Sequence, residues 1–308
     1  MKSLRLFRPT RRRLLFLGTC ALLLTALWLL LSLIVVHVLT RRPHARFDEP
    51  APVVAWGVFE EHRLQTRDGE SLGAWFHRGS PGGPSVVVLH GNRGCRRDGL
   101  PVAEFFAGRG YAVLLVSLRA HGDSTGEVND FGYSARHDVV AAVEFLLRER
   151  PRRSVLVHGT SMGAAAAIFA SAELGERVVG YVLESPYQSL HQALRNRTAM
   201  YLPPLLDRIA YAGAVLAGPL VLPEADRIVP IDHVAGIPPS VPVLFLSGTK
   251  DDRAHPSEAQ ALCDRIAGHA RLVLFEGAGH GCLIRADPQR YAEAVTPLLD
   301  LIAGPSGR

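Results

Sequence analysis

The chain has 308 residues, of which 48% are hydrophobic and 20% are charged, and it contains 29 glycines, 21 prolines and 4 cysteines. These values exclude a disordered chain, a collagen-like repeat and a small disulfide-stabilised domain. The formal charge is +5, but residues 47–308 alone carry 25 positive and 29 negative charges. Because the excess of basic residues is confined to the N-terminus, the composition predicts no nucleic-acid partner, which would require a basic folded face.

Residues 14–39 contain no Asp, Glu, Lys or Arg. A helix of this length would span roughly 39 Å, and the hydrocarbon core of a bilayer is about 30 Å thick. A cleaved signal peptide would have a shorter apolar region followed by small residues. The segment is therefore predicted to be a transmembrane signal anchor. More basic residues precede it than follow it, which predicts that residues 1–13 are a cytoplasmic tail and that the body lies on the non-cytoplasmic side.

The rest of the chain alternates between strand and helix patterns. Residues 40–52 are polar and Pro-rich, as in a linker, and 53–308 form the body. Within the body, 54–78 predicts an antiparallel hairpin around an Asp-Gly turn. Further strands are predicted at 86–89, 112–118, 155–157, 178–183, 243–246 and 272–275, and helices at 97–108, 134–149 and 162–174. This alternation predicts an α/β body built on a mostly parallel, doubly wound sheet.

Residues 187–239 interrupt this alternation without a clear strand pattern. They are rich in Leu, Ala, Tyr and Pro, and the apolar run 209–222 is broken by Pro219 and too short to cross a bilayer. Two interpretations are open. The segment is either a helical insertion that completes the core, or a lid whose apolar face lines an acyl pocket or touches a membrane.

The pattern Gly-x-Ser-x-Gly occurs twice, at 122–126 and at 159–163. It is typical of a sharp strand-to-helix turn that holds a serine hydroxyl clear of a sheet. Ser124 is followed by a turn, whereas Ser161 directly follows a predicted strand and opens the alanine-rich helix 162–174. This context selects Ser161 as the candidate nucleophile and leaves Ser124 as a loop residue.

A nucleophilic serine needs a histidine base and a carboxylate that orients that base. His280 lies in the glycine-rich segment 277–281, directly after the last predicted strand. Since the expected chain order is serine, acid, histidine, the acid should follow the strand 243–246. Asp251 is the predicted acid, and its neighbour Asp252 is the alternative.

The oxyanion formed during attack needs two fixed N–H donors. The backbone of Met162, directly after the nucleophile, is predicted to supply one of them. The other is predicted to be Asn92, because Gly91 allows the loop after its strand to turn backbone amides inward. His90 and His158 end apolar strands and are expected to be core histidines with satisfied hydrogen bonds.

Taken together, these motifs resemble the serine α/β-hydrolase superfamily, and within it the lysophospholipase-like and serine-aminopeptidase-like branch, several of whose members are membrane-anchored. The resemblance covers about residues 55–303. It depends on the joint order of the segments 90–92, 119–126, 159–163, 184–187, 248–251 and 279–280. It implies an α/β-hydrolase fold with a helical lid and hydrolysis of an ester, thioester or amide through an acyl-enzyme, without metal or organic cofactor.

The predicted function is therefore a membrane-anchored serine hydrolase that cleaves a carboxylic ester, such as a lipophilic ester or a lysophospholipid. Its expected partners are that small-molecule ester and the membrane. One alternative is a serine aminopeptidase, in which Glu184 would bind the substrate amine, or a thioesterase of the same fold. Another is a catalytically silent binding module.

Cysteine usage leaves one pairing open. Cys20 lies in the predicted transmembrane helix, and the body contains Cys95, Cys263 and Cys282, an odd number that cannot all pair. The loops that hold Cys95 and Cys282 approach each other on this fold, which raises the hypothesis of a disulfide beside the site.

Overall fold

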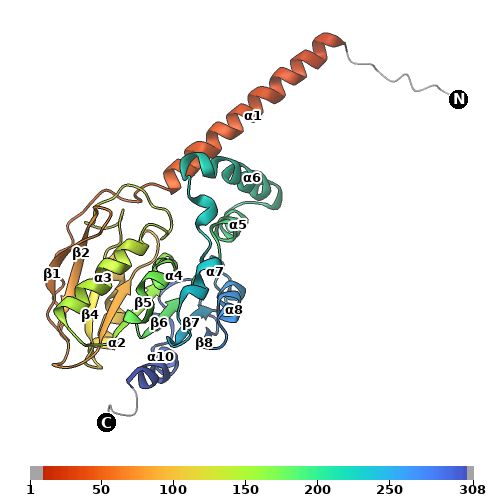
Figure 1. The fold of residues 1–308 in the computed structure, drawn as a ribbon. Helices are drawn as coiled ribbons and strands as arrows, with labels where there is room; N and C mark the ends of the chain where they lie inside the picture. The colour runs from red at the N-terminus through yellow and green to blue at the C-terminus, as the bar shows by residue number, and fades with distance from the viewer. Residues whose placement is uncertain (1–9, 304–308) are drawn as a thin grey trace.

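The computed structural model describes residues 10–303 and places one eight-stranded sheet at the centre of the body (Figure 1). The strand order is β1-β2-β4-β3-β5-β6-β7-β8, in which β1 pairs antiparallel with β2, β2 pairs antiparallel with β4, and all other pairs are parallel. The strands are β1 (Glu60–Gln65), β2 (Ser71–His77), β3 (Ser85–Leu89), β4 (Ala112–Val116), β5 (Val155–Thr160), β6 (Gly180–Glu184), β7 (Val243–Gly248) and β8 (Ala270–Phe275). The predicted hairpin and the predicted parallel sheet are both confirmed.

Helices cover both faces of this sheet. One face packs against α3 (Arg136–Glu149), α4 (Met162–Leu174) and α8 (Pro256–Arg265), and the other against α2 (Leu100–Ala107), α9 (Leu283–Ala286) and α10 (Pro288–Ala303). Short 3-10 turns are η1 (Arg96–Gly99), η2 (Gly175–Arg177), η3 (Ala225–Arg227) and η4 (Val234–Gly236). The sheet is therefore doubly wound, as the sequence predicts.

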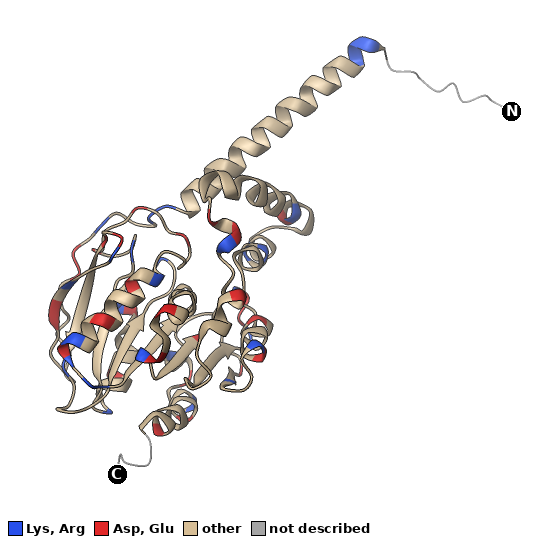
Figure 2. Cartoon of the chain, viewed as in Figure 1, with Lys and Arg blue, Asp and Glu red and all other residues tan. Residues whose placement is uncertain are grey.

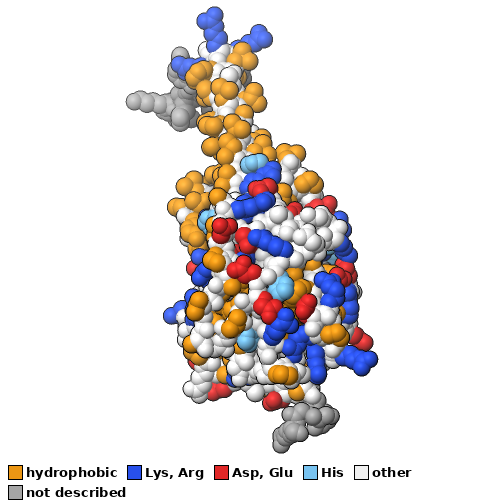
Figure 3. Space-filling model, turned by 90° about the vertical axis from the view of Figure 1, so that its left-hand side faces the viewer, with side chains coloured by type: hydrophobic (Ala, Val, Ile, Leu, Met, Phe, Trp, Pro, Cys, Tyr) orange, Lys and Arg blue, Asp and Glu red, His pale blue; other side chains and the backbone are white. Residues whose placement is uncertain are grey.

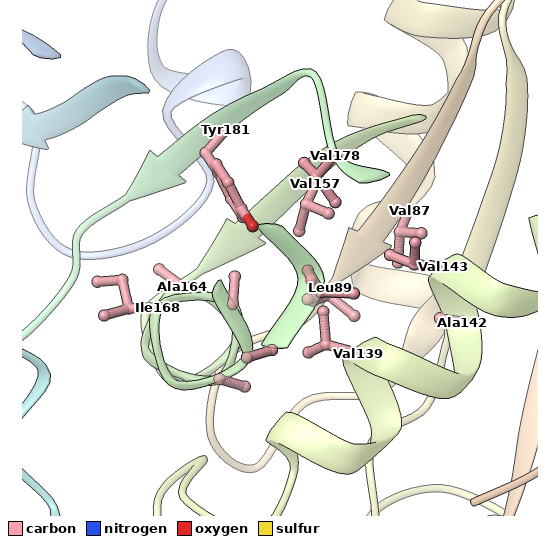
Figure 4. Packing of buried hydrophobic residues seen from close by; sticks show 14 of the residues in the cluster. Val87, Leu89, Val139, Ala142, Val143, Val157, Ala164, Ile168, Val178 and Tyr181 are labelled. Atoms are coloured by element: carbon pink, nitrogen blue, oxygen red, sulfur yellow. The ribbon is translucent and has the colours of Figure 1, made fainter. Parts of the chain in front are cut away.

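The central strands are apolar throughout because both of their faces are covered. In β3, Val87 belongs to the core on the α3 and α4 side, whereas Val86 and Val88 belong to the core on the α2 side. Figure 4 shows Val87 packed among side chains of neighbouring strands and of α3, including Val143. Alternate side chains of the strand thus contribute to two cores, one on each face of the sheet. This packing holds the strand ends in place, and the polar loops lie there.

Helix α1 (Arg11–Leu39) extends from the body as a stalk (Figure 1). Among its residues only Ser32 and Val36 are buried, and the helix is long and apolar enough to cross a membrane. Of the predicted basic tail, residues 1–9 lie outside the described part of the chain.

The linker after α1 lies against the body. The guanidinium of Arg42 donates to the carbonyl oxygens of Gly122 at 3.2 Å and of Gly126 at 2.8 Å. Glu49 is buried and pairs with Arg96, with 3.1 Å between Oε2 and NH1. These contacts hold residues 40–52 against the loop that follows β4 and against η1.

Residues 187–239, all of which the structure describes, form helices and no strand. They include α5 (Leu190–Tyr201), α6 (Pro204–Val221) and α7 (Pro230–His233). Ser189 caps α5, because its hydroxyl oxygen accepts the N–H of Gln192 at 3.1 Å. Helix α6 lies beside the end of α1 that is nearer the body (Figure 1).

Candidate active site

The turn between β5 and α4 holds Ser161 in a constrained conformation. Its φ of 53° and ψ of −111° lie outside the regions that non-glycine residues favour. The flanking glycines are required, since a Cβ at Gly159 would lie 2.5 Å from the carbonyl oxygen of Gly163, and one at Gly163 would lie 2.7 Å from that of Leu89. The N–H of Ser161 donates to the carbonyl of Glu184 at 2.7 Å, which fixes the turn to β6.

Three side chains from three loops meet at the carboxyl edge of the sheet. His280 Nε2 lies 3.0 Å from Ser161 Oγ, and His280 Nδ1 lies 2.9 Å from Asp251 Oδ2 and 3.0 Å from Oδ1. A carboxylate can only accept, so Nδ1 is the protonated nitrogen and Nε2 is free to accept the serine proton. The structure therefore brings the three residues chosen from the sequence into one hydrogen-bonded chain.

Asp251, rather than Asp252, contacts the imidazole. Asp251 is 1% exposed, and its Oδ1 also accepts the N–H groups of Arg253 and Ala254 at 3.0 and 2.9 Å. Burial alone would raise the pKa of this carboxyl, but the hydrogen bond and charge of His280, with the two backbone donors, hold it below its ordinary value. The next residue, Asp252, is exposed on the surface.

The two predicted oxyanion donors flank the serine. Met162 is the first residue of α4, and Asn92 follows Gly91, where a Cβ would lie 3.5 Å from Ser161 Cβ. Among the hydrogen bonds of residues 10–303, neither the Met162 N–H nor the Asn92 N–H has a protein acceptor. Both donors are therefore free to bind an oxygen of a substrate beside the serine.

Two buried histidines hold the loop that contains Asn92. His90 Nδ1–H donates to the carbonyl of Gly91 at 2.7 Å, and its Nε2 accepts the N–H of Leu118 at 3.0 Å. His121 Nε2 accepts the N–H of Arg93 at 3.2 Å. Burial lowers the pKa of His90 to about 4 and, with the neighbouring His90, that of His121 to about 3. Both imidazoles are therefore neutral at physiological pH.

The structure adds one residue that the sequence did not single out and a different role for another. Asn129 Nδ2 donates to Asn92 Oδ1 at 2.8 Å, and only this three-dimensional contact reveals it. Glu184, which the sequence offered as a binding group for a substrate amine, instead accepts the N–H of Leu283, the first residue of α9, through Oε1 at 2.7 Å. Ser124 is a buried loop residue, as expected, and its hydroxyl accepts the N–H of Gly73 at 2.9 Å.

Two expectations about buried side chains are corrected. His90 is a satisfied core histidine, but neither ring nitrogen of His158 has a hydrogen-bond partner among the described residues, and Glu184 Oε2 lies 3.6 Å from its Nε2. Cys95 and Cys282 are free thiols. Burial is the main reason that their pKa values rise, to about 12 and about 11 respectively.

Metal-ligand clusters and hollows are the other places in the described chain where a site could form. No three His, Cys, Asp or Glu side chains within residues 10–303 are grouped to hold a metal ion. A hollow of about 750 Å³ is lined by residues 178–179, 239–244 and 268–271. These residues precede or begin β6, β7 and β8, so this hollow lies at the opposite edge of the sheet from Ser161.

The arrangement is that of an α/β-hydrolase fold: a strained strand-to-helix turn, a histidine and a carboxylate at the carboxyl edge of a doubly wound sheet. The model of the alpha/beta hydrolase family matches residues 86–294, and the chain belongs to this family. The predicted α/β-hydrolase fold is thereby confirmed.

Relatives and solved structures agree with this assignment. The chain is 30% identical over 222 residues to an uncharacterized protein of Mycobacterium tuberculosis, with 70% of each chain covered. It is 24% identical to an uncharacterized membrane protein of Saccharomyces cerevisiae, covering 74% of this chain and 76% of that one. Among solved structures, an esterase of Pyrococcus furiosus shares the fold with a TM-score of 0.65 and 24% identity, covering 83% of this chain and 98% of that chain.

Proposed function

We propose that this chain is a membrane-anchored serine hydrolase that cleaves a lipophilic carboxylic ester, such as a lysophospholipid, through an acyl-enzyme. Ser161 attacks the carbonyl carbon while His280 takes its proton, and Asp251 stabilises the resulting imidazolium. The N–H groups of Asn92 and Met162 bind the oxyanion. His280 then returns the proton to the leaving alcohol, and water repeats the sequence to release the acid.

The observation that supports this proposal most directly is the chain of contacts from Ser161 Oγ through His280 to Asp251, at 3.0 and 2.9 Å. Each contact is within the range in which a base can remove a serine proton. The free N–H groups on the other side of the serine provide the second requirement, a site for developing negative charge.

The surface of α1 supports anchoring in a membrane. Its charged residues lie only at its start, whereas charges are spread over the body (Figure 2). Hydrophobic side chains cover the stalk (Figure 3). A bilayer would cover this apolar surface, which the body does not bury. With six basic residues before the uncharged segment 14–39 and three soon after it, the proposed orientation places the N-terminus in the cytoplasm and the hydrolase body outside it.

The contacts of Glu184 argue against the aminopeptidase alternative. Glu184 is fully buried, and one of its oxygens holds the Leu283 N–H. It is therefore unavailable to bind the amine of a peptide. Asp251 is likewise occupied, by His280, so esters remain the proposed substrate class.

The test is Ser161→Ala in the full chain, purified in detergent and assayed on activated esters of increasing acyl length. Loss of the nucleophile should lower turnover by about 10⁵-fold or more. The exposed and distant Ser240 provides the matched control, and Ser240→Ala should keep wild-type turnover. A fluorophosphonate probe should label the wild type and the control but not Ser161→Ala. An unlabelled, inactive wild type would instead identify a silent module.

A further inference from the structure

The outer face of α6 is unusually apolar. Its large exposed hydrophobic side chains are Leu205, Leu206, Ile209, Leu216 and Leu220, and the end of α5 and the turn after it add Tyr201 and Leu202. Leu205 and Leu220 are 71% and 76% exposed. A continuous exposed apolar face of this kind marks an interaction surface.

Helix α6 packs directly on the candidate membrane-spanning helix. Trp28 Nε1 donates to the carbonyl oxygen of Ile209 at 3.2 Å. A Cβ at Gly213 would lie 2.1 Å from Ser32 Oγ, so the absence of a side chain allows the two helices to approach closely. Small residues at the contact are typical of helix pairs within membranes.

These contacts place α6 at the depth of the apolar part of α1. Trp28 contacts Ile209, and Val36, further along α1, is buried with Ala214 and Ala217, further along α6. The two helices therefore run in the same direction where they pack. Trp28 lies eleven residues before Leu39, the last residue of α1. At about 1.5 Å per residue this is roughly 16 Å, about half of a 30 Å hydrocarbon core. If lipid surrounds Trp28, it also surrounds the residues of α6 beside it.

We propose that α6 is embedded in the bilayer that holds α1, with its outer leucines among the acyl chains of the leaflet nearer the hydrolase body. This inference depends on the proposed anchoring by α1. The 18 residues of α6 would span about 27 Å, and the chain returns to the body on both sides, through α5 and through η3. Helix α6 therefore enters the bilayer without forming a second span.

Asp207, one of the two charged residues of α6, fits this position. It is buried, and its Oδ1 lies 3.3 Å from NH1 of Arg195 on α5, so the helix presents no free carboxylate to lipid. Arg208 is exposed and is the one charged side chain of α6 that embedding would bring to lipid. An embedded α6 would attach the insertion above the active site to the membrane, and an ester dissolved in the lipid would meet the enzyme at this helix.

Photolabelling of the full chain in phospholipid nanodiscs tests the proposal. The probe is a phosphatidylcholine with a diazirine in its acyl chain, and adducts are mapped on tryptic peptides. The α6 peptides 198–208 and 209–227 should carry at least about tenfold more adducts than the peptide of α10 that begins at Tyr291, because acyl chains do not reach water-exposed surfaces. That peptide is a matched control, since Leu301 within it is 67% exposed and α10 lies at the opposite end of the body from α1 (Figure 1).

The peptides of α1 distinguish the possible failures. Adducts on α1 with no excess on α6 would overturn the embedding of α6 and leave the proposed anchoring intact. Absence of adducts on α1 would contradict the anchoring and this inference together. Loss or retention of esterase activity by Ser161→Ala is independent of both results.

A double variant in α6 and a control variant in α10 test whether labelling of α6 depends on its exposed leucines. Leu205→Asn with Leu220→Asn removes two exposed leucines, so it disturbs no packing and should leave the fold intact. Adducts on the α6 peptides should fall about threefold or more relative to those on α1, because asparagine disfavours contact of this face with acyl chains. Leu301→Asn, the control, should leave labelling of α6 unchanged. Undiminished labelling of α6 in the double variant would overturn the proposal.

Discussion

Acid should destabilise this protein through the two buried histidines, His90 and His121, that hold the loop containing Asn92. Burial lowers the pKa of His90 from 6.5 to about 4. As the pH falls below 6.5, the unfolded chain binds a proton at this residue, but the folded protein does not until about pH 4. The free energy of unfolding therefore decreases through this window as the pH falls, and the loss levels off below the pKa of the folded state.

The magnitude follows from the two pKa values. At pH 5 His90 alone lowers the free energy of unfolding by about 2 kcal/mol relative to its value well above pH 6.5. His121 lies beside it, with 5.1 Å between the ring centroids, and its pKa is about 3. Since two imidazolium ions at this separation repel each other, the folded protein is further prevented from accepting both protons.

The assay compares wild type with His90→Asn by urea unfolding in detergent at pH 8 and pH 5. The buried Trp75 provides the fluorescence signal. The variant should be less stable at pH 8, because it loses the bond to the Leu118 N–H, but its stability should fall by about 2 kcal/mol less between the two pH values. Other groups that titrate between pH 5 and pH 8 contribute equally to the loss of stability in both proteins, so the difference between the two losses reports on His90. Equal losses in both proteins would refute the assignment of acid sensitivity to His90.

The remaining predictions concern the triad acid and the turn at the nucleophile. Asp251→Asn should lower kcat by about 10⁴-fold, whereas Asp252→Asn should stay within about twofold, as measured by steady-state ester hydrolysis; the reverse order would assign the acid to Asp252. Gly163→Ala places a Cβ 2.7 Å from the carbonyl oxygen of Leu89, so it should cost about 1–3 kcal/mol in urea unfolding and reduce activity. Gly268→Ala, which meets nothing within 4 Å, is its control, and equal effects would contradict the packing argument.

The features that could be predicted from the sequence are those in which local chemistry determines geometry. Buried parallel strands require continuous apolar runs, and the turn at Ser161 requires glycine on both sides, because backbone atoms lie within 3 Å of the missing side chains. His280 and Asp251 could be placed because each follows a strand, and the carboxyl ends of parallel strands share one edge. The choice between Asp251 and Asp252 needed the structure, because neighbouring residues have the same sequence context.

Other features depend on long-range packing that no local pattern encodes. Helix α8 has only four buried residues in ten, so its apolar pattern is short. The contact of α6 with α1 joins segments about 180 residues apart through a glycine and a backbone carbonyl. The unsatisfied ring of His158 could not be foreseen either, because a histidine at the end of an apolar strand gives no indication of its partners.

The linker shows most clearly how polar composition can conceal a rigid connection. The carbonyl oxygen of Thr40, just after α1, accepts the N–H of Asn129 at 2.8 Å, and the side chain of Asn129 donates to Asn92 at 2.8 Å. Arg42 binds backbone carbonyls of the same loop. Since every residue offers a carbonyl, no sequence pattern marks these acceptors. The end of α1 is thus only two hydrogen bonds from Asn92, so hydrogen bonds connect the stalk to the loop beside the candidate site.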